Sequence, residues 1–224
     1  QAGVATPPQA FAAVVALDLR DGVDREALVR LMRIWTDDIE RLTQGREGLA
    51  DTEPELAHVP ARLSVTVGVG PGVFTAAGLE SVRPSWLAPL PDFTGDRLQD
   101  RWNGGDLVLQ VCADDEVTVA HAVRLLTKEA RTFVTVRWTQ RGFRRAHGST
   151  EPGASTRNLM GQVDGTSNPD PTRDAPLIWV GDESAARFGA QPAWLTGGTA
   201  MVVRRIAMQL DTWDELDRSG REEA

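Results

Sequence analysis

Residues 106–140 read DLVLQVCADDEVTVAHAVRLLTKEARTFVTVRWTQ, and this stretch decides the fold. Apolar side chains alternate from Asp106 to Ala113, which is typical of a β-strand. Asp114 is a candidate N-cap for a helix in which apolar residues recur at helical spacing. Alternation resumes from Thr132 to Gln140. The stretch therefore predicts a strand, a helix and a second strand.

The same pattern precedes this stretch. Ala10 to Arg20 reads as a strand, a helix capped by Asp24 follows and ends near Gly45, and Arg62 to Val69 alternates again. The complete order is β-α-β-β-α-β, which is the split βαβ or ferredoxin-like unit. We therefore expect an α+β fold in which an antiparallel sheet carries both helices on one face.

A second, incomplete unit is predicted after the first. Residues 70–105 are rich in Pro, Gly and Asp and predict a surface excursion with a short helix near Phe74. Thr199 to Leu210 is a long strand pattern, and the capping boxes Thr212-x-x-Glu215 and Ser219-x-x-Glu222 each predict a helix start. The expected organisation is tandem ferredoxin-like units with antiparallel sheets: residues 1–145 as the first unit, 146–198 as a linking loop, and 199–224 as the truncated start of the second. We expect the chain to be an N-terminal portion.

Composition excludes several classes of protein and partner. The chain has 224 residues and a net charge of −8, which opposes binding to nucleic acid or to an anionic membrane surface. No apolar run approaches the roughly 18 residues of a membrane span. Cys112 is the only cysteine, so an internal disulfide and a zinc site built on several thiolates are excluded. The N-terminus has no signal-peptide pattern and suits a mature protein from which a signal has been removed.

One loop motif carries candidate chemistry. Residues 158–169 read NLMGQVDGTSNP, and Asp164-Gly165 and Asn168-Pro169 are also ordinary turn dipeptides. Apolar residues flank the first turn, so we expect Asp164 to be carried into a partly buried setting. A buried carboxylate beside a glycine that permits close backbone approach is a plausible acid-base group.

The motif G-Q-V-D-G-T resembles the G-x-x-D-G-T motif of dye-decolourising haem peroxidases. The preceding R-N-L-M-G and the following S-N-P are similar to their secreted subgroup, which is related to deferrochelatases. The resemblance extends across the chain, through the G-D-L-V-L-Q strand with its C-A-D-D sequel and the G-G-T and V-V-R-R-I stretch before T-W-D.

This resemblance implies haem b (iron protoporphyrin IX) as cofactor, hydrogen peroxide as oxidant, and a dye, phenolic or other aromatic compound as reductant. Asp164 is then the distal acid-base residue, which takes a proton from the iron-bound oxygen of peroxide and returns it to the outer oxygen. Gly165 would line the haem through its backbone, and Thr166 and Ser167 through their hydroxyls. The subgroup implies a secreted or extracytoplasmic location.

The iron's protein ligand is the main departure from the family. The axial His and the distal Arg of the family lie well downstream of the motif, so we expect the axial His downstream of Ala224 and no metal ligand in this chain. His58, His121 and His147 do not fit that role. We therefore expect the chain to work with a C-terminal remainder of the same protein, either as a separate chain or as further residues.

Other interpretations stay open. A deferrochelatase-like or non-catalytic haem-binding module is the alternative function. The oxygen-rich loop from Asp164 to Asp174 is not an EF-hand, because Pro169 and Ala175 stand where Gly and Glu are required, but an irregular calcium site remains. One of Arg204 and Arg205 is expected to face a buried side, in an ion pair or with a haem propionate. Among the seven tryptophans, we expect core positions for Trp35, Trp138 and Trp179, and candidate electron carriers among Trp86, Trp102 and Trp213.

Overall fold

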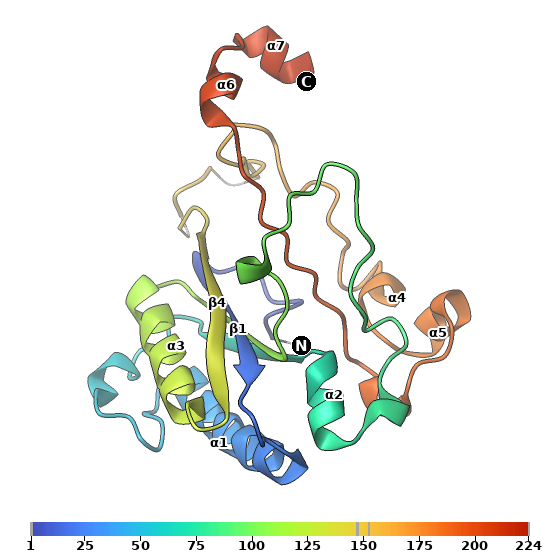
Figure 1. Cartoon of the computed structure of the whole chain (residues 1–224). Coiled ribbons are helices and arrows are strands. Elements are labelled where there is room, and N and C mark those ends of the chain that lie inside the picture. The colour runs from blue at the N-terminus through green and yellow to red at the C-terminus, as the bar shows by residue number, and fades with distance from the viewer. Residues whose placement is uncertain (1, 147, 152, 224) are drawn as a thin grey trace. The chain divides into compact units, whose positions relative to one another are not determined.

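Four strands form one antiparallel sheet in the N-terminal part of the chain, with the spatial order β2-β3-β1-β4. The strands are β1 (Phe11–Leu19), β2 (Ser64–Val69), β3 (Leu107–Ala113) and β4 (Val134–Phe143). Helix α1 (Arg25–Thr43) connects β1 to β2, and α3 (Glu116–Ala130) connects β3 to β4. This is the predicted α+β, ferredoxin-like arrangement, and it is confirmed (Figure 1).

The computed structural model describes residues 2–146, 148–151 and 153–223. Internal contacts divide the chain into unit 1 (residues 1–149), which contains the sheet, and unit 2 (residues 150–224). No helix within the described ranges combines the length and the apolar character needed to cross a membrane.

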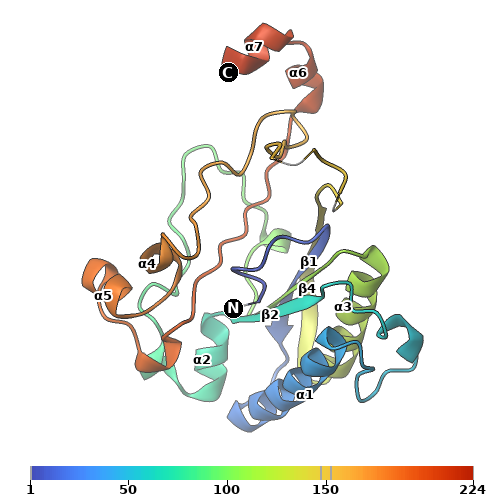
Figure 2. The ribbon, with the colours of Figure 1, turned by 180° about the vertical axis from the view of Figure 1, so that it is seen from behind.

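The core of unit 1 lies between one face of the sheet and the two long helices. Alternate residues of β1 and β3 are fully buried, as the sequence pattern predicts, and β1 lies antiparallel to β3 with Val15 opposite Leu109. These strand residues form one apolar cluster with Leu31 and Trp35 of α1 and Leu126 of α3. Helices α1 and α3 lie side by side over this face, as Figures 1 and 2 show. Burial of this face fixes the register of the sheet.

Trp35 is the central aromatic residue of this layer. Its side chain is 1% exposed, and its indole Nε1 donates a hydrogen bond to the Leu126 carbonyl oxygen at 3.0 Å. The prediction of a core position is therefore confirmed for Trp35. It is wrong for Trp138 and Trp179, which are half-buried. The Trp138 indole lies at the sheet margin, where its Nε1 donates to the Gly104 carbonyl oxygen at 3.0 Å.

The helix caps agree with the sequence at α1 and differ at α3. Asp24 caps α1, with its carboxylate accepting from the Ala27 N–H at 2.9 Å. Asp115, and not Asp114, caps α3 through the Thr118 N–H at 2.7 Å. Asp114 is held elsewhere, because its carboxylate pairs with the Arg62 guanidinium. Two adjacent aspartates offer the same capping chemistry, and this tertiary contact decides between them.

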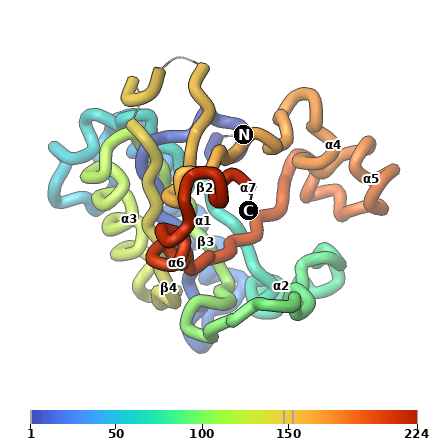
Figure 3. The backbone as a smooth tube through the Cα atoms, turned by 90° about the horizontal axis from the view of Figure 1, so that it is seen from above, coloured from blue at the N-terminus to red at the C-terminus, as the bar shows by residue number. Residues whose placement is uncertain are grey.

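The remaining helices are short. Helix α2 (Pro71–Ala77) is the predicted helix near Phe74. Unit 2 contains α4 (Ala175–Ile178), α5 (Asp182–Phe188), α6 (Leu210–Asp214) and α7 (Arg218–Glu223). Figure 3 shows α6 leading directly into α7 at the C-terminal end of the chain. Four 3₁₀ turns lie at Pro54–Leu56, Glu80–Val82, Asp100–Trp102 and Ala193–Leu195.

The predicted strand Thr199–Leu210 is wrong in this structure. Residues 200–209 are extended but irregular and exposed, with Ile206 78% exposed. None of the strands in the described part of the chain pairs with them, so they are not part of a sheet. For the same reason neither Arg204 nor Arg205 faces a buried side, as both are exposed.

The predicted helix starts also shift. Helix α6 begins at Leu210, so Thr212 lies inside the helix and does not cap it. Helix α7 begins at Arg218, so Ser219 likewise lies inside its first turn. Both predictions of a capping box are therefore wrong, although helices do form at both places.

Candidate functional site

The G-x-x-D-G-T motif, residues 161–166, begins at the tip of a hairpin that spans residues 156–164 and continues past its base; we call this hairpin the motif hairpin. Its two sides pair at an antiparallel bridge between Arg157 and Val163. Thr156 holds Asp164 from both directions, because its carbonyl oxygen accepts from the Asp164 N–H at 2.9 Å and its Oγ1 donates to the Asp164 carbonyl oxygen at 2.7 Å. The backbone of Asp164 is thus fixed by local hydrogen bonds.

Asn158 organises the tip of the motif hairpin. Its Oδ1 accepts from the N–H groups of Met160 and Gln162, at 2.9 and 3.2 Å. Gly161 follows with φ of +78°, and Gly165 has φ of +80° after the Asp164 position. Only glycine adopts this left-handed region without cost, so two glycines permit the turns on either side of Val163-Asp164. The spacing of the motif is therefore explained by backbone geometry.

The side chain of Asp164 is exposed, which contradicts the expected partly buried setting. The flanking apolar residues do not cover it, since Leu159 is 67% and Val163 46% exposed. Gly165, Thr166 and Ser167 are exposed as well. Among the described residues, no hydrogen bond or ion pair engages the Asp164 carboxylate oxygens. The motif thus combines a fixed backbone with a carboxylate that is open to an incoming molecule.

The motif hairpin is tied to the C-terminal helices of unit 2. The Trp213 indole Nε1 on α6 donates to the Met160 carbonyl oxygen at 2.9 Å, and the Gln162 side chain donates to the Arg221 carbonyl oxygen. This positioning role of Trp213 could not be predicted from the sequence, because the contact joins residues 53 positions apart. A groove of about 580 Å³ lies at this junction. It is lined by Arg157, Met160, Gly161, Gln162, Leu216, Arg218, Arg221 and Glu222.

The acidic residues after the motif are engaged locally. The pKa of Asp170 is lowered because its carboxylate accepts from the Arg173 and Thr172 N–H groups, at 2.8 and 2.9 Å. The pKa of Asp174 is lowered by the Arg173 guanidinium at 2.9 Å. Within the described residues, no group of three or more His, Cys, Asp or Glu side chains could hold a metal ion. These contacts give no support to the irregular calcium site.

The histidines lie apart from the motif in sequence, and residues 150–224 contain neither His nor Cys. The His121 Nε2 lies 2.9 Å from the Asp51 carboxylate, and both side chains are buried in unit 1. His147 lies outside the described residues. Unit 2 therefore presents an unengaged carboxylate, open hydroxyls and a glycine backbone, but its sequence contains no imidazole or thiolate that could bind an iron.

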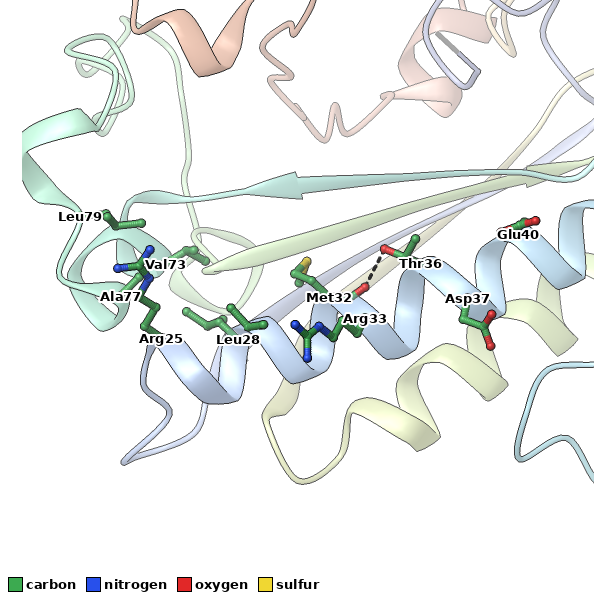
Figure 4. A pocket seen from close by; sticks show the side chains of 11 residues that line it. Arg25, Leu28, Met32, Arg33, Thr36, Asp37, Glu40, Val73, Ala77 and Leu79 are labelled. Atoms are coloured by element: carbon green, nitrogen blue, oxygen red, sulfur yellow. Dashed lines mark hydrogen bonds between the residues drawn. The ribbon is translucent and has the colours of Figure 1, made fainter.

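A second groove lies in unit 1, between α1 and α2. Figure 4 shows the side chains that line it, which include Leu28, Met32, Arg25 and Arg33 of α1. Its volume is about 600 Å³, and no residue of the motif hairpin lines it. The two grooves are similar in volume, so the chemistry of the motif, and not size, selects the motif hairpin.

Family models match almost the whole chain. The model described as Dyp-type peroxidase, N-terminal, matches residues 1–144, and the model described as Dyp-type peroxidase, C-terminal, matches residues 155–223. The second match includes the motif hairpin. The expectation that the chain is only an N-terminal portion, with C-terminal residues missing or supplied by a separate chain, is therefore not supported.

Known proteins resemble the chain over its full length. It is 41% identical to a dye-decolorizing peroxidase of Thermobifida fusca, over 99% of this chain and 53% of that protein, and 35% identical to a deferrochelatase of Yersinia pestis, over 96% and 51%. The crystal structure of a DyP-type peroxidase from Cellulomonas bogoriensis matches with a TM-score of 0.93 and 62% identity, over 99% of this chain and 60% of that one. Ferric DtpA from Streptomyces lividans matches with a TM-score of 0.90 and 41% identity, over 100% and 59%. The chain spans about half the length of the curated relatives it matches.

Proposed function

Because the chain belongs to the Dyp-type peroxidase family, we propose that it acts in a haem-dependent peroxidase reaction in which Asp164 moves the peroxide proton. Hydrogen peroxide takes up two electrons and two protons, its O–O bond breaks, and two water molecules form. The electrons come from two molecules of a dye or phenolic reductant, each oxidised by one electron. Bound haem b would supply the iron at which peroxide is reduced.

Asp164 suits a proton-transfer role because its backbone is fixed while its carboxylate is unengaged. A positioned carboxylate accepts a proton from one peroxide oxygen and donates it to the other, which allows the second oxygen to leave as water. This transfer requires that no internal partner compete for the carboxylate oxygens. The open Asp164 carboxylate, held by Thr156 through the backbone alone, is the observation that carries the proposal.

The motif residues fit one side of a haem site. The Gly165 backbone allows close approach, and Thr166 and Ser167 present exposed hydroxyls that can bond to the carboxylates of the cofactor. The iron ligand is a separate matter, because residues 150–224 contain no histidine. An axial His downstream of Ala224 stays a prediction, and the proton transfer assigned to Asp164 does not depend on its source.

Asp164→Asn in the haem-loaded protein tests the proposal. The amide cannot accept the proton, so we expect peroxide-dependent dye oxidation to fall by roughly 10²- to 10⁴-fold, the range for loss of a positioned acid-base group. The matched control is Asp170→Asn, which changes an exposed carboxylate of the same loop and keeps an acceptor oxygen for the Thr172 and Arg173 N–H groups. An unchanged haem absorption spectrum would show that binding is intact. Equal rates in the two variants would remove Asp164 from the reaction.

The deferrochelatase relative favours a second candidate, which is removal of iron from haem. Incubation of the protein with haem, followed by fluorescence of metal-free porphyrin, distinguishes the two. Free porphyrin without dye oxidation would favour the second candidate. Haem binding with neither activity would indicate a non-catalytic module.

We also propose that the protein is located outside the cytoplasm, on the basis of the secreted subgroup that the motif resembles. Cell fractionation with antibody detection tests this location. The net charge of −8 supports small molecules rather than nucleic acid or an anionic membrane as partners. A retained protein found only in the cytoplasmic fraction would contradict the proposed location.

A further inference from the structure

A buried carboxyl group on α1 and a half-buried one on α3 lie together, outside the proposed reaction site. Asp38 on α1 is 0% exposed. Its Oδ2 is buried without a hydrogen-bond partner, and so is the Oε2 of Glu129 on α3. Two ionised carboxylates offer only acceptors and cannot satisfy each other. A single proton between them turns one of the two into a donor and removes both unsatisfied oxygens.

These groups hold one short segment of the loop after α1, Leu49–Asp51, which we call the latch segment. The Asp38 Oδ1 accepts from the Leu49 N–H at 2.7 Å, and Glu129 accepts from the Ala50 N–H. The Lys128 Nζ donates to the Ala50 carbonyl oxygen at 3.1 Å. Backbone groups of Leu49 and Ala50 are thus held by side chains from α1 and α3.

The two ends of the latch segment are also fixed by packing and by a hydrogen bond between side chains. Asp51 meets His121 of α3 at 2.9 Å, with both side chains almost fully buried. At the other end, a Cβ on Gly48 would lie 2.6 Å from Leu125 Cδ2 and 3.0 Å from Asp38 Oδ1. The loop therefore packs closely against α1 and α3 beside the carboxyl pair.

We propose that Asp38 and Glu129 share one proton and that this proton locks the latch segment onto α1 and α3. Loss of the proton leaves two negative charges whose facing oxygens are buried without partners, which favours departure of the segment and hydration of both carboxylates. The result is a latch that loosens as pH rises.

The burial and the charges around the pair determine the pH range in which the latch segment loosens. Burial first, and then the neighbouring Asp38 carboxyl group with its negative charge, raise the pKa of Glu129 from 4.5 to about 8. The Ala50 N–H and the Lys128 ammonium act in the opposite direction and are outweighed. Because Glu129 binds its proton more tightly in the closed form, the closed form is fully favoured below the ordinary pKa of a glutamate. The equilibrium constant for closing the latch segment falls by up to tenfold per pH unit until the pH passes the raised pKa of Glu129. Above that pH the constant no longer changes.

Site-resolved hydrogen exchange of the Leu49 and Ala50 amides tests the latch in the intact chain. After correction for the intrinsic dependence of exchange on pH, we expect protection to fall at least tenfold between pH 6 and pH 8 and to level off at higher pH. Glu129→Gln keeps an acceptor for the Ala50 N–H and gives Asp38 a permanent donor, so its protection should not change with pH. Glu47→Gln removes an exposed carboxyl from the same loop and should follow the wild type.

Three results would overturn the proposal. The first is constant protection in the wild type from pH 6 to pH 9, and the second is an unchanged pH dependence in Glu129→Gln. The third is protection restored at pH 8 by added calcium, which would show that the carboxyl pair holds a cation and not a proton. If Glu129→Gln does not fold, Asp38→Asn supplies the same donor from the other helix and carries the same expectation.

Discussion

Replacement of Trp35 by Phe tests the packing between the sheet and the two long helices of unit 1. Trp35 is 1% exposed and its Nε1 donates to the Leu126 carbonyl oxygen at 3.0 Å. Loss of this buried hydrogen bond costs about 1 kcal/mol. The ring atoms that Phe lacks leave a space in a close-packed layer, which costs about 1 kcal/mol more. We therefore expect the free energy of unfolding to fall by about 2 kcal/mol.

Urea unfolding followed by far-ultraviolet circular dichroism measures this change without relying on tryptophan emission. The midpoint should decrease while the slope of free energy against urea stays the same, because the surface exposed on unfolding hardly changes. Trp86→Phe is the matched control, since Trp86 is 41% exposed, and it should lie within about 0.5 kcal/mol of the wild type. Equal stabilities of the Trp35 and Trp86 variants would refute the described core.

Two further predictions concern local features. Asp24→Ala removes the carboxylate that accepts from the Ala27 N–H, so we expect the free energy of unfolding to fall by about 1 kcal/mol, measured by the same urea transition. Asp24→Asn keeps an acceptor oxygen and should retain most of the stability that this cap provides. Burial raises the pKa of the Cys112 thiol, so reaction of the native protein with a thiol reagent at pH 7 should be much slower than reaction of the urea-unfolded chain, and equal rates would contradict this burial.

The sequence predicts unit 1 well because its residues repeat a local pattern. Alternation places β1, β3 and β4 to within a few residues, and Asp24 marks the start of α1. Such patterns indicate which face of a helix or strand is buried. In unit 1 these faces pack against one another, so the local pattern is enough to predict the elements. The excursion between β2 and β3 and its helix α2 also follow from Pro and Gly positions.

Contacts between distant residues could not be predicted. Adjacent aspartates compete for the cap of α3, and only the pairing of Asp114 with Arg62 decides between them. The alternating pattern at 199–210 favours a strand, but a strand forms only when a neighbouring strand pairs with it. None of the described strands pairs with this segment. The exposure of Asp164 is a further example, because apolar neighbours in sequence do not cover it in space.

The most direct test of the central claim is the rate at which haem-loaded protein reacts with peroxide in a single turnover, with no dye present. The wild type, Asp164→Asn and Asp164→Glu are mixed with excess hydrogen peroxide, and the change in haem absorbance is followed by stopped flow. We expect the Asn variant to react at least about 100-fold more slowly, with partial recovery in the Glu variant, which restores a carboxyl group. An Asn variant that reacts as fast as the wild type would contradict the assignment of proton transfer to Asp164.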